Sequence, residues 1–118
     1  MLFKDNSDDA ELKIMDFGLA KQMDSSSGDA LMTTQCGSPT YYAPEVMFAS
    51  AGKGYDCKCD VWSLAVIMYV MLCGLPPFWE EDGSDIMAGD YSYDIEEPNT
   101  WPAVSSEAKD LIDKVCWP

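Results

Sequence analysis

One long apolar run dominates the pattern of hydrophobic and polar positions along the chain. Every residue from 61 to 73 is apolar except Ser63. Asp60 stands before this run as a candidate helix N-cap, and Gly74 followed by Pro76–Pro77 favours an end just after it. The run is shorter than the roughly 20 residues that a membrane span needs. We therefore expect a helix that is buried on all sides and forms the axis of a core.

Weaker patterns predict a hairpin and a loop. Short apolar or alternating runs at residues 2–3 and 12–15 flank a group of turn formers at residues 6–10, which is typical of a β-hairpin. Residues 22–40 are rich in serine and threonine and contain few large apolar side chains, so we expect a long loop there.

A second helix is predicted near the end of the sequence. Apolar residues recur at positions i, i+3, i+4 and i+7 over residues 105–116, which indicates one apolar stripe on a helix. Ser105 or Ser106 can cap its start. The stripe consists of Ala108, Leu111, Ile112 and Val115. Together these elements predict a mainly α fold with a short N-terminal β-hairpin.

The composition excludes several classes of function, because some residue types are rare or absent. The chain has 118 residues, of which 21 are acidic and 7 basic, and it contains neither arginine nor histidine. Nucleic acid is excluded as a partner, because such binding depends on clustered basic residues. Histidine general-base catalysis and histidine-containing zinc sites are excluded as well. No arginine of this chain can bind a phosphate in bidentate fashion.

The acidic residues are concentrated in one stretch. No basic residue lies between Lys58 and Lys109, whereas residues 80–97 carry eight carboxylates. Two interpretations stay open. The stretch is either a solvated face that keeps the protein soluble, or a surface that attracts a basic partner or peptide.

Five cysteines and the absence of an apolar leader favour a reducing compartment. The cysteines are an odd number, and residues 1–5 do not resemble a secretory signal. The spacing of Cys57 and Cys59 does not match the usual paired zinc motifs. We expect buried free thiols, no membrane association and an intracellular location, cytoplasmic or nuclear.

Asp16-Phe17-Gly18 is the first motif that suggests chemistry. It follows the second predicted strand, and a carboxylate at the end of a strand can hold Mg²⁺ together with phosphate oxygens and water. Phe17 can anchor the turn in a core, and Gly18 allows backbone angles that other residues avoid. Taken alone, the tripeptide is better explained as a simple exit into a loop.

A second motif changes this interpretation. Ala43-Pro44-Glu45 stands downstream, and the two motifs bracket a loop in the manner of protein kinases. Over essentially all 118 residues the chain resembles the C-terminal lobe of a protein kinase. The resemblance leans towards serine/threonine kinases of the calcium/calmodulin-dependent group, with checkpoint-type relatives nearly as close. It is carried by residues 16–18, 36–46, 55–64 and 72–78.

The resemblance implies an incomplete C-lobe of the protein-kinase-like α+β fold. Residues 1–15 would form the hairpin before the metal-binding motif. Residues 16–45 would form the activation segment, and residues 46–118 the truncated helical part. The first residues would follow the catalytic loop directly, and no Gly-x-Gly-x-x-Gly or His-Arg-Asp sequence is present.

The resemblance also implies roles for individual residues. Asp16, with Phe17 and Gly18, would bind the Mg²⁺ that bridges the phosphates of ATP. Thr34, with its neighbour Thr33, would be the activating phosphosite, although both are also ordinary polar loop residues.

Further residues would position the substrate or support the fold. Glu45 would pair with an arginine that the chain does not contain. Asp60 would hold the catalytic loop through backbone hydrogen bonds, or serve only as an N-cap. The residues that would position the phosphoacceptor are Ser38, Thr40, Tyr41 and Tyr42.

Two functions follow as hypotheses. The first is part of an ATP-dependent protein serine/threonine kinase that lacks the N-lobe and the catalytic loop and is inactive alone. Its partners would be a protein substrate, with basic residues near the acceptor, and an upstream activating kinase. The second is a non-catalytic, kinase-derived interaction module with an acidic binding face at residues 80–97.

Overall fold

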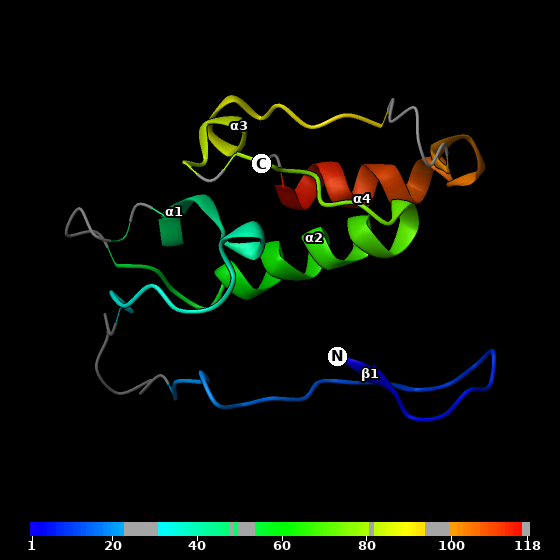
Figure 1. The fold of residues 1–118 in the computed structure, drawn as a ribbon, viewed down its shortest axis with the longest axis horizontal. Coiled ribbons are helices and arrows are strands. Elements are labelled where there is room, and N and C mark those ends of the chain that lie inside the picture. The colour runs from blue at the N-terminus through cyan, green and yellow to red at the C-terminus, as the bar shows by residue number, and fades with distance from the viewer. Residues whose placement is uncertain (23–30, 48, 50–53, 81, 94–99, 117–118) are drawn as a thin grey trace.

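The fold is mainly helical, with one small antiparallel sheet near the N-terminus (Figure 1). The computed structural model describes residues 1–22, 31–47, 49, 54–80, 82–93 and 100–116. Its elements in chain order are β1 (Leu2–Phe3), β2 (Leu12–Lys13), the 3-10 helix η1 (Pro39–Tyr41), α1 (Pro44–Met47), α2 (Cys59–Cys73), α3 (Ser84–Ala88), the 3-10 helix η3 (Trp101–Ala103) and α4 (Ser106–Cys116). Within this described part, no helix is long and apolar enough to cross a membrane.

Helix α2 is the predicted apolar helix, and its two ends differ in how well they match the prediction. It ends as expected, because Gly74 adopts a left-handed conformation with φ 85° and its N–H bonds to the Val70 carbonyl. It begins earlier than expected. The Asp56 carboxylate accepts the Lys58 N–H at 2.8 Å and forms a turn that leads into the helix. Asp60 therefore lies in the first turn, and its prediction as N-cap is wrong.

Replacing Gly74 with alanine is expected to lower the free energy of unfolding by about 1–2 kcal/mol, because a Cβ disfavours the left-handed conformation. Asparagine visits this conformation more readily, so Gly74→Asn should lose less than Gly74→Ala. Urea denaturation of the two variants measures the difference. Equal losses would contradict the role given to the positive φ at this position.

Helix α4 packs along α2, and the two helices form the centre of the fold (Figure 1). The Ser105 hydroxyl accepts the Ala108 N–H at 3.2 Å, so of the two candidate caps it is Ser105 that caps the helix. Ile112 and Cys116 are buried against the core, whereas Leu111 is 53% exposed. Of the predicted apolar stripe, Ile112 is thus buried, whereas Leu111 is mostly exposed.

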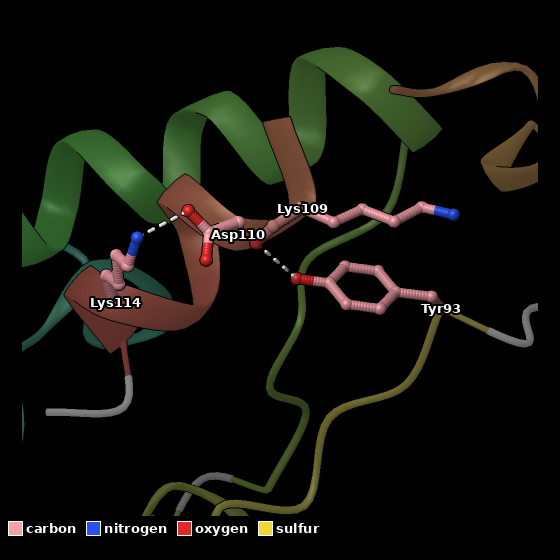
Figure 2. Close-up of polar contacts among 4 residues, drawn as sticks. All are labelled: Tyr93, Lys109, Asp110 and Lys114. Atoms are coloured by element: carbon pink, nitrogen blue, oxygen red, sulfur yellow. Dashed lines mark hydrogen bonds and ion pairs between the residues drawn. The ribbon is translucent and has the colours of Figure 1, made fainter. Parts of the chain in front are cut away.

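An aromatic cluster fills the space beside these helices. The ring of Trp101, which is only 1% exposed, lies 4.7 Å from Tyr69 and 4.5 Å from Tyr93 between ring centroids. Burial raises the pKa of Tyr69 to about 12. Figure 2 shows Tyr93 against α4, where its hydroxyl oxygen lies 3.2 Å from the carbonyl oxygen of Lys109. The cluster therefore links the chain before α4 to both helices.

One face of α2 is not covered, contrary to the prediction of a helix buried on all sides. Val61, Leu64 and Met71 are 51%, 47% and 60% exposed, although Val66 and Tyr69 on the same helix are fully buried. The exposed side chains recur at helical spacing and form a stripe. An apolar sequence alone does not show which faces have neighbours, and within the described residues none covers this stripe.

The N-terminal arm, residues 1–22, contains the predicted hairpin. Strands β1 and β2 pair antiparallel, with Leu2 opposite Lys13 and Phe3 opposite Leu12. Almost every residue of the arm is exposed, and the arm lies apart from the helices (Figure 1). The accessible surface of 8437 Å² accordingly exceeds the roughly 6,400 Å² typical of a compact protein of 13.1 kDa.

The five cysteines are unpaired, but they are not all buried. Cys59, Cys73 and Cys116 lie in the core, whereas Cys36 and Cys57 are exposed, so the expectation of buried thiols is wrong for these two. Burial, followed by nearby carboxylates, raises the pKa of Cys59 and Cys116 to about 11. The two buried thiols are therefore protonated and unreactive at neutral pH.

Candidate functional site

The Asp16-Phe17-Gly18 motif lies on the exposed arm after β2. The unusual backbone conformation belongs to Asp16, with φ 65°, and not to Gly18 as expected. The Asp16 carboxylate accepts the Gly18 N–H at 3.3 Å, which makes a tight turn. Phe17 is 70% exposed, so the prediction that it anchors the turn in a core is wrong. The described residues place nothing over the arm that could bury this ring.

The chemistry of Asp16 fits a single magnesium ligand. Mg²⁺ in nucleotide sites is bound by one or two carboxylates together with phosphate oxygens and water. Asp16 supplies one exposed carboxylate, with one oxygen already accepting a backbone hydrogen bond. Among the residues that the structure describes, no group of three potential metal ligands comes together. Asp16 could therefore share a metal ion with a bound phosphate, but could not form a metal site by itself.

Thr33 and Thr34 lie on an exposed strip that is attached to the chain before α2. Met32 and Tyr55 exchange two backbone hydrogen bonds of 2.8 Å, and the Tyr55 hydroxyl donates to the Thr34 carbonyl at 2.6 Å. Both threonine side chains remain exposed. The backbone here is thus held in place while the two hydroxyls are accessible. Residues 23–30, the other part of the predicted loop, lie outside the described residues.

The residues predicted to position a substrate form a compact turn around η1. Ser38 precedes this 3-10 helix, Thr40 and Tyr41 lie within it, and Tyr42 follows it. The Tyr42 hydroxyl donates to the Gly37 carbonyl at 3.0 Å, which folds the turn onto itself. The side chains of Ser38, Thr40 and Tyr41 are exposed. The structure therefore brings these four residues together on the surface.

Glu45 lies in α1 at the edge of a cavity of about 580 Å³. The cavity is lined by Lys58 and Trp62 at the start of α2 and by Lys114 and Cys116 of α4. Glu45 is exposed, so its carboxylate is not the buried, unpaired charge that a missing arginine would leave in a closed site. Lys114 is paired with Asp110 at 2.6 Å, as Figure 2 shows.

Asp60 lies on the first turn of α2. Its carboxylate is exposed and accepts a weak contact from the Cys59 thiol at 3.9 Å. No described backbone N–H bonds to it, so its predicted role towards a catalytic loop stays a prediction. The Asp16 motif, in contrast, shares no hydrogen bond with residues 31–116 within the described part of the chain.

Two residues that the sequence reasoning missed connect this region. Gln35 bonds to the end of α1, and Ser63 bonds from α2 to the carbonyl of Tyr41. Ser63 could have been noticed as the one polar residue of the apolar run, but nothing in the sequence indicated its partner. No sequence pattern distinguished Gln35.

The acidic stretch is only partly described. Glu81, Asp94, Glu96 and Glu97 lie outside the described residues. Of the others, Asp85 accepts the backbone N–H groups of Trp79 and Glu80, and Asp82 accepts that of Ser84 at 2.9 Å. These two carboxylates serve as acceptors in turns around α3. Hydrogen bonding to Ser84 lowers the pKa of Asp82.

Comparison with known proteins places these features in one family. The family model described as the protein kinase domain matches residues 1–118. Calcium/calmodulin-dependent protein kinase type 1 of Macrobrachium nipponense is 40% identical over 116 residues, which cover 95% of this chain and 31% of that protein. Calcium-dependent protein kinase 12 of Arabidopsis thaliana is 42% identical over 118 residues, which cover 97% of this chain and 22% of that protein.

A third relative shows the same proportions. Myosin light chain kinase A of Dictyostelium discoideum is 40% identical over 116 residues, which cover 98% of this chain and 37% of that protein. The chain thus spans between about a fifth and somewhat more than a third of the length of these relatives. Its relatives are protein serine/threonine kinases, and the calcium/calmodulin-dependent group is among them. The match over the whole sequence shows that the chain belongs to the protein kinase family.

Proposed function

We propose that the chain is part of an ATP-dependent protein serine/threonine kinase and corresponds to a portion of its C-terminal lobe. The observation that supports this most strongly is the order of the motifs within the family match. Asp16-Phe17-Gly18 precedes Ala43-Pro44-Glu45, and the apolar helix α2 follows. The reaction would transfer the γ-phosphoryl group of ATP to a serine or threonine hydroxyl of a protein.

In this proposal Asp16 is the residue that binds the metal of the nucleotide. When bound, Mg²⁺ neutralises negative charge on the phosphate oxygens. The turn formed by the Gly18 N–H holds one Asp16 oxygen and leaves the other free to bind. The exposure of the motif supports the idea that its partners are groups outside residues 1–118, since a kinase also needs a phosphate-binding loop, a lysine and a catalytic aspartate.

Thr34, with Thr33 beside it, is proposed as the site of activating phosphorylation by an upstream kinase. Both hydroxyls are exposed, while Tyr55 holds the backbone next to them. A phosphate there would add about two negative charges and strong acceptor oxygens. Because this chain has no arginine to pair with them, any charged partner would be a lysine or would come from another segment.

The proposed substrate is a protein segment that docks at Ser38, Thr40, Tyr41 and Tyr42. Basic residues near its acceptor would be favoured by the net charge of −14. The proposed location is intracellular, cytoplasmic or nuclear, which the five unpaired cysteines support. The alternative of a non-catalytic module with an acidic face gains no support from Asp82 and Asp85, because both are engaged in local turns.

The purified 118-residue chain is expected to show no ATP-dependent phosphorylation of a protein or peptide, because it contains no His-Arg-Asp loop. The sequence encoded directly upstream is expected to contain that loop and its asparagine in frame. A chain extended by this sequence should transfer radiolabelled phosphate. In the extended chain Asp16→Asn should reduce transfer by about 100-fold or more, since it removes a metal ligand.

Three results would contradict the proposal. Transfer by the 118-residue chain that disappears in Asp16→Asn would show that the upstream elements are not needed. An upstream sequence without the catalytic loop would favour the non-catalytic alternative. An extended chain whose activity does not change in Asp16→Asn would remove Asp16 from its proposed role. Asp9→Asn, an exposed carboxylate in the hairpin turn, is the matched control and should retain activity.

A further inference from the structure

The segment of residues 35–47, called the 35–47 loop below, is closed by one side chain. The Gln35 Nε2 atom lies 2.9 Å from the Val46 carbonyl oxygen and 2.6 Å from that of Met47. A primary amide has two N–H groups, so it can donate to both carbonyls at once. These carbonyls belong to the last turn of α1, where a helix has no partners of its own for them. Gln35 therefore caps α1 and joins the two ends of the loop.

A residue of α2 holds the middle of the same loop. The Ser63 hydroxyl oxygen lies 2.7 Å from the Tyr41 carbonyl oxygen and 3.2 Å from that of Cys59. A hydroxyl has one proton to donate, and the shorter contact is to Tyr41. Since the Cys59 carbonyl belongs to the hydrogen-bond ladder of α2, the bond to Tyr41 is the one that joins two elements. Ser63 thus fixes the backbone of the loop to the central helix.

Two further backbone hydrogen bonds form within the loop. The Tyr41 N–H donates to Ser38 and the Tyr42 N–H donates to Pro39, at 3.0 and 2.9 Å. The side chains of Ser38, Thr40 and Tyr41 point to solvent and make no hydrogen bond from their hydroxyls within the described residues. The backbone of the loop is therefore held by Gln35, by Ser63 and by hydrogen bonds within the loop. The side chains that would meet a substrate remain accessible.

We propose that Gln35 and Ser63 are positioning residues, which hold residues 38–42 in the conformation that presents Thr40 and Tyr41 to a protein substrate. The proposal rests on the proposed kinase function. A positioning role and a general stabilising role predict different effects when Ser63 is substituted. Ser63 is half-buried within a helix, where alanine is the better helix former. Loss of the hydroxyl should therefore loosen the loop and leave the stability of α2 nearly unchanged.

Amide hydrogen exchange of the 118-residue chain tests this role. In Ser63→Ala the amides of Tyr41 and Tyr42 should exchange about five- to tenfold faster, because one hydrogen bond that holds the loop is lost. The amides of Val66 and Tyr69 should keep their rates. Ser63→Thr keeps the hydroxyl and should restore slow exchange. Ser106→Ala, whose hydroxyl contacts only Glu107 on its own helix, should leave the loop unchanged.

Gln35→Glu tests the other end of the loop, because glutamate has nearly the same shape but no N–H to donate at neutral pH. The amides of Val46 and Met47 should exchange about five- to tenfold faster in this variant. Gln35→Asn is too short to reach α1 and should behave in the same way.

Each of the following results would overturn the positioning role. The first is that the loop amides of the wild-type chain exchange as fast as those of a free peptide. The second is that Ser63→Ala and Ser63→Thr exchange at the same rate. The third is that the increase in Ser63→Ala extends equally through α2 and α4, which would indicate a general loss of stability. None of these readouts uses phosphoryl transfer, so a failure of the positioning role can be distinguished from a failure of the role proposed for Asp16.

Discussion

Replacing Trp101 with alanine is expected to lower the free energy of unfolding by about 3–5 kcal/mol. The indole is 1% exposed and contacts the rings of Tyr69 and Tyr93, and the Lys109 ammonium lies 6.0 Å from its centroid. Truncation removes the largest fully buried side chain of the described core and leaves a cavity next to Tyr69 and Tyr93. Denaturation by urea, followed by far-ultraviolet circular dichroism, measures the loss.

Trp79 provides the matched control. It is the same residue type but is 64% exposed, so Trp79→Ala should change the free energy of unfolding by no more than about 0.5 kcal/mol. Similar losses for the two variants would show that the aromatic cluster does not hold the helices together. Trp101→Phe, which retains an aromatic ring at the site, should fall between the wild-type chain and Trp101→Ala.

Asp113→Ala is expected to lower the free energy of unfolding by about 2 kcal/mol at neutral pH. The hydroxyls of Tyr91 and Tyr93 both donate to the same Asp113 oxygen at 2.6 Å, and hydrogen bonds to a charged acceptor are among the stronger ones. Removal of the carboxylate leaves two half-buried phenols without this acceptor. Asp110→Ala removes only an exposed ion pair on the same helix, so it should cost less than about 1 kcal/mol.

The same residues predict how stability depends on alkaline pH. Burial, followed by the hydrogen bonds to Asp113, raises the pKa of Tyr91 and Tyr93 well above the ordinary value. In the unfolded chain these phenols lose protons from about pH 10, whereas in the folded chain they retain them. The folded state then binds more protons, so its stability is complete below about pH 10 and decreases as the pH rises further.

Denaturation at a series of pH values, together with ultraviolet titration of the phenolates, measures this decrease. In Asp113→Ala the decrease should be shallower than in the wild-type chain, because one cause of the raised pKa is gone while burial remains. A decrease as steep as in the wild-type chain would show that Asp113 does not influence the two phenols.

The sequence predicted elements well where their causes are local. Gly74 ends α2 through its own conformation, and Ser105 caps α4 through a neighbour three residues away. The start of α2 was misplaced because both Asp56 and Asp60 are suitable for a helix start. Which of them is used depends on the turn that the chain makes before the helix, and spacing alone does not determine this.

Burial and long-range contacts could not be predicted in the same way. The apolar character of Phe17 and Leu64 suggested a core, but burial depends on which other segments cover a side chain. Gln35 and Ser63 bond to residues 11 and 22 positions away along the sequence. Such partners have no periodic signature, so the residues that hold the candidate substrate loop became visible only in the folded chain.

The exposed N-terminal arm carries the proposed metal ligand Asp16 but contributes little to thermal stability. Calorimetry records the heat taken up when buried surface meets water, and the arm buries almost none. The enthalpy and heat capacity of unfolding therefore belong to the helical part of the chain. Asp16, which lies on the arm, can be altered without a measurable effect on melting. The proposed metal ligand and the buried core thus lie in different parts of this molecule, and each can be changed without the other.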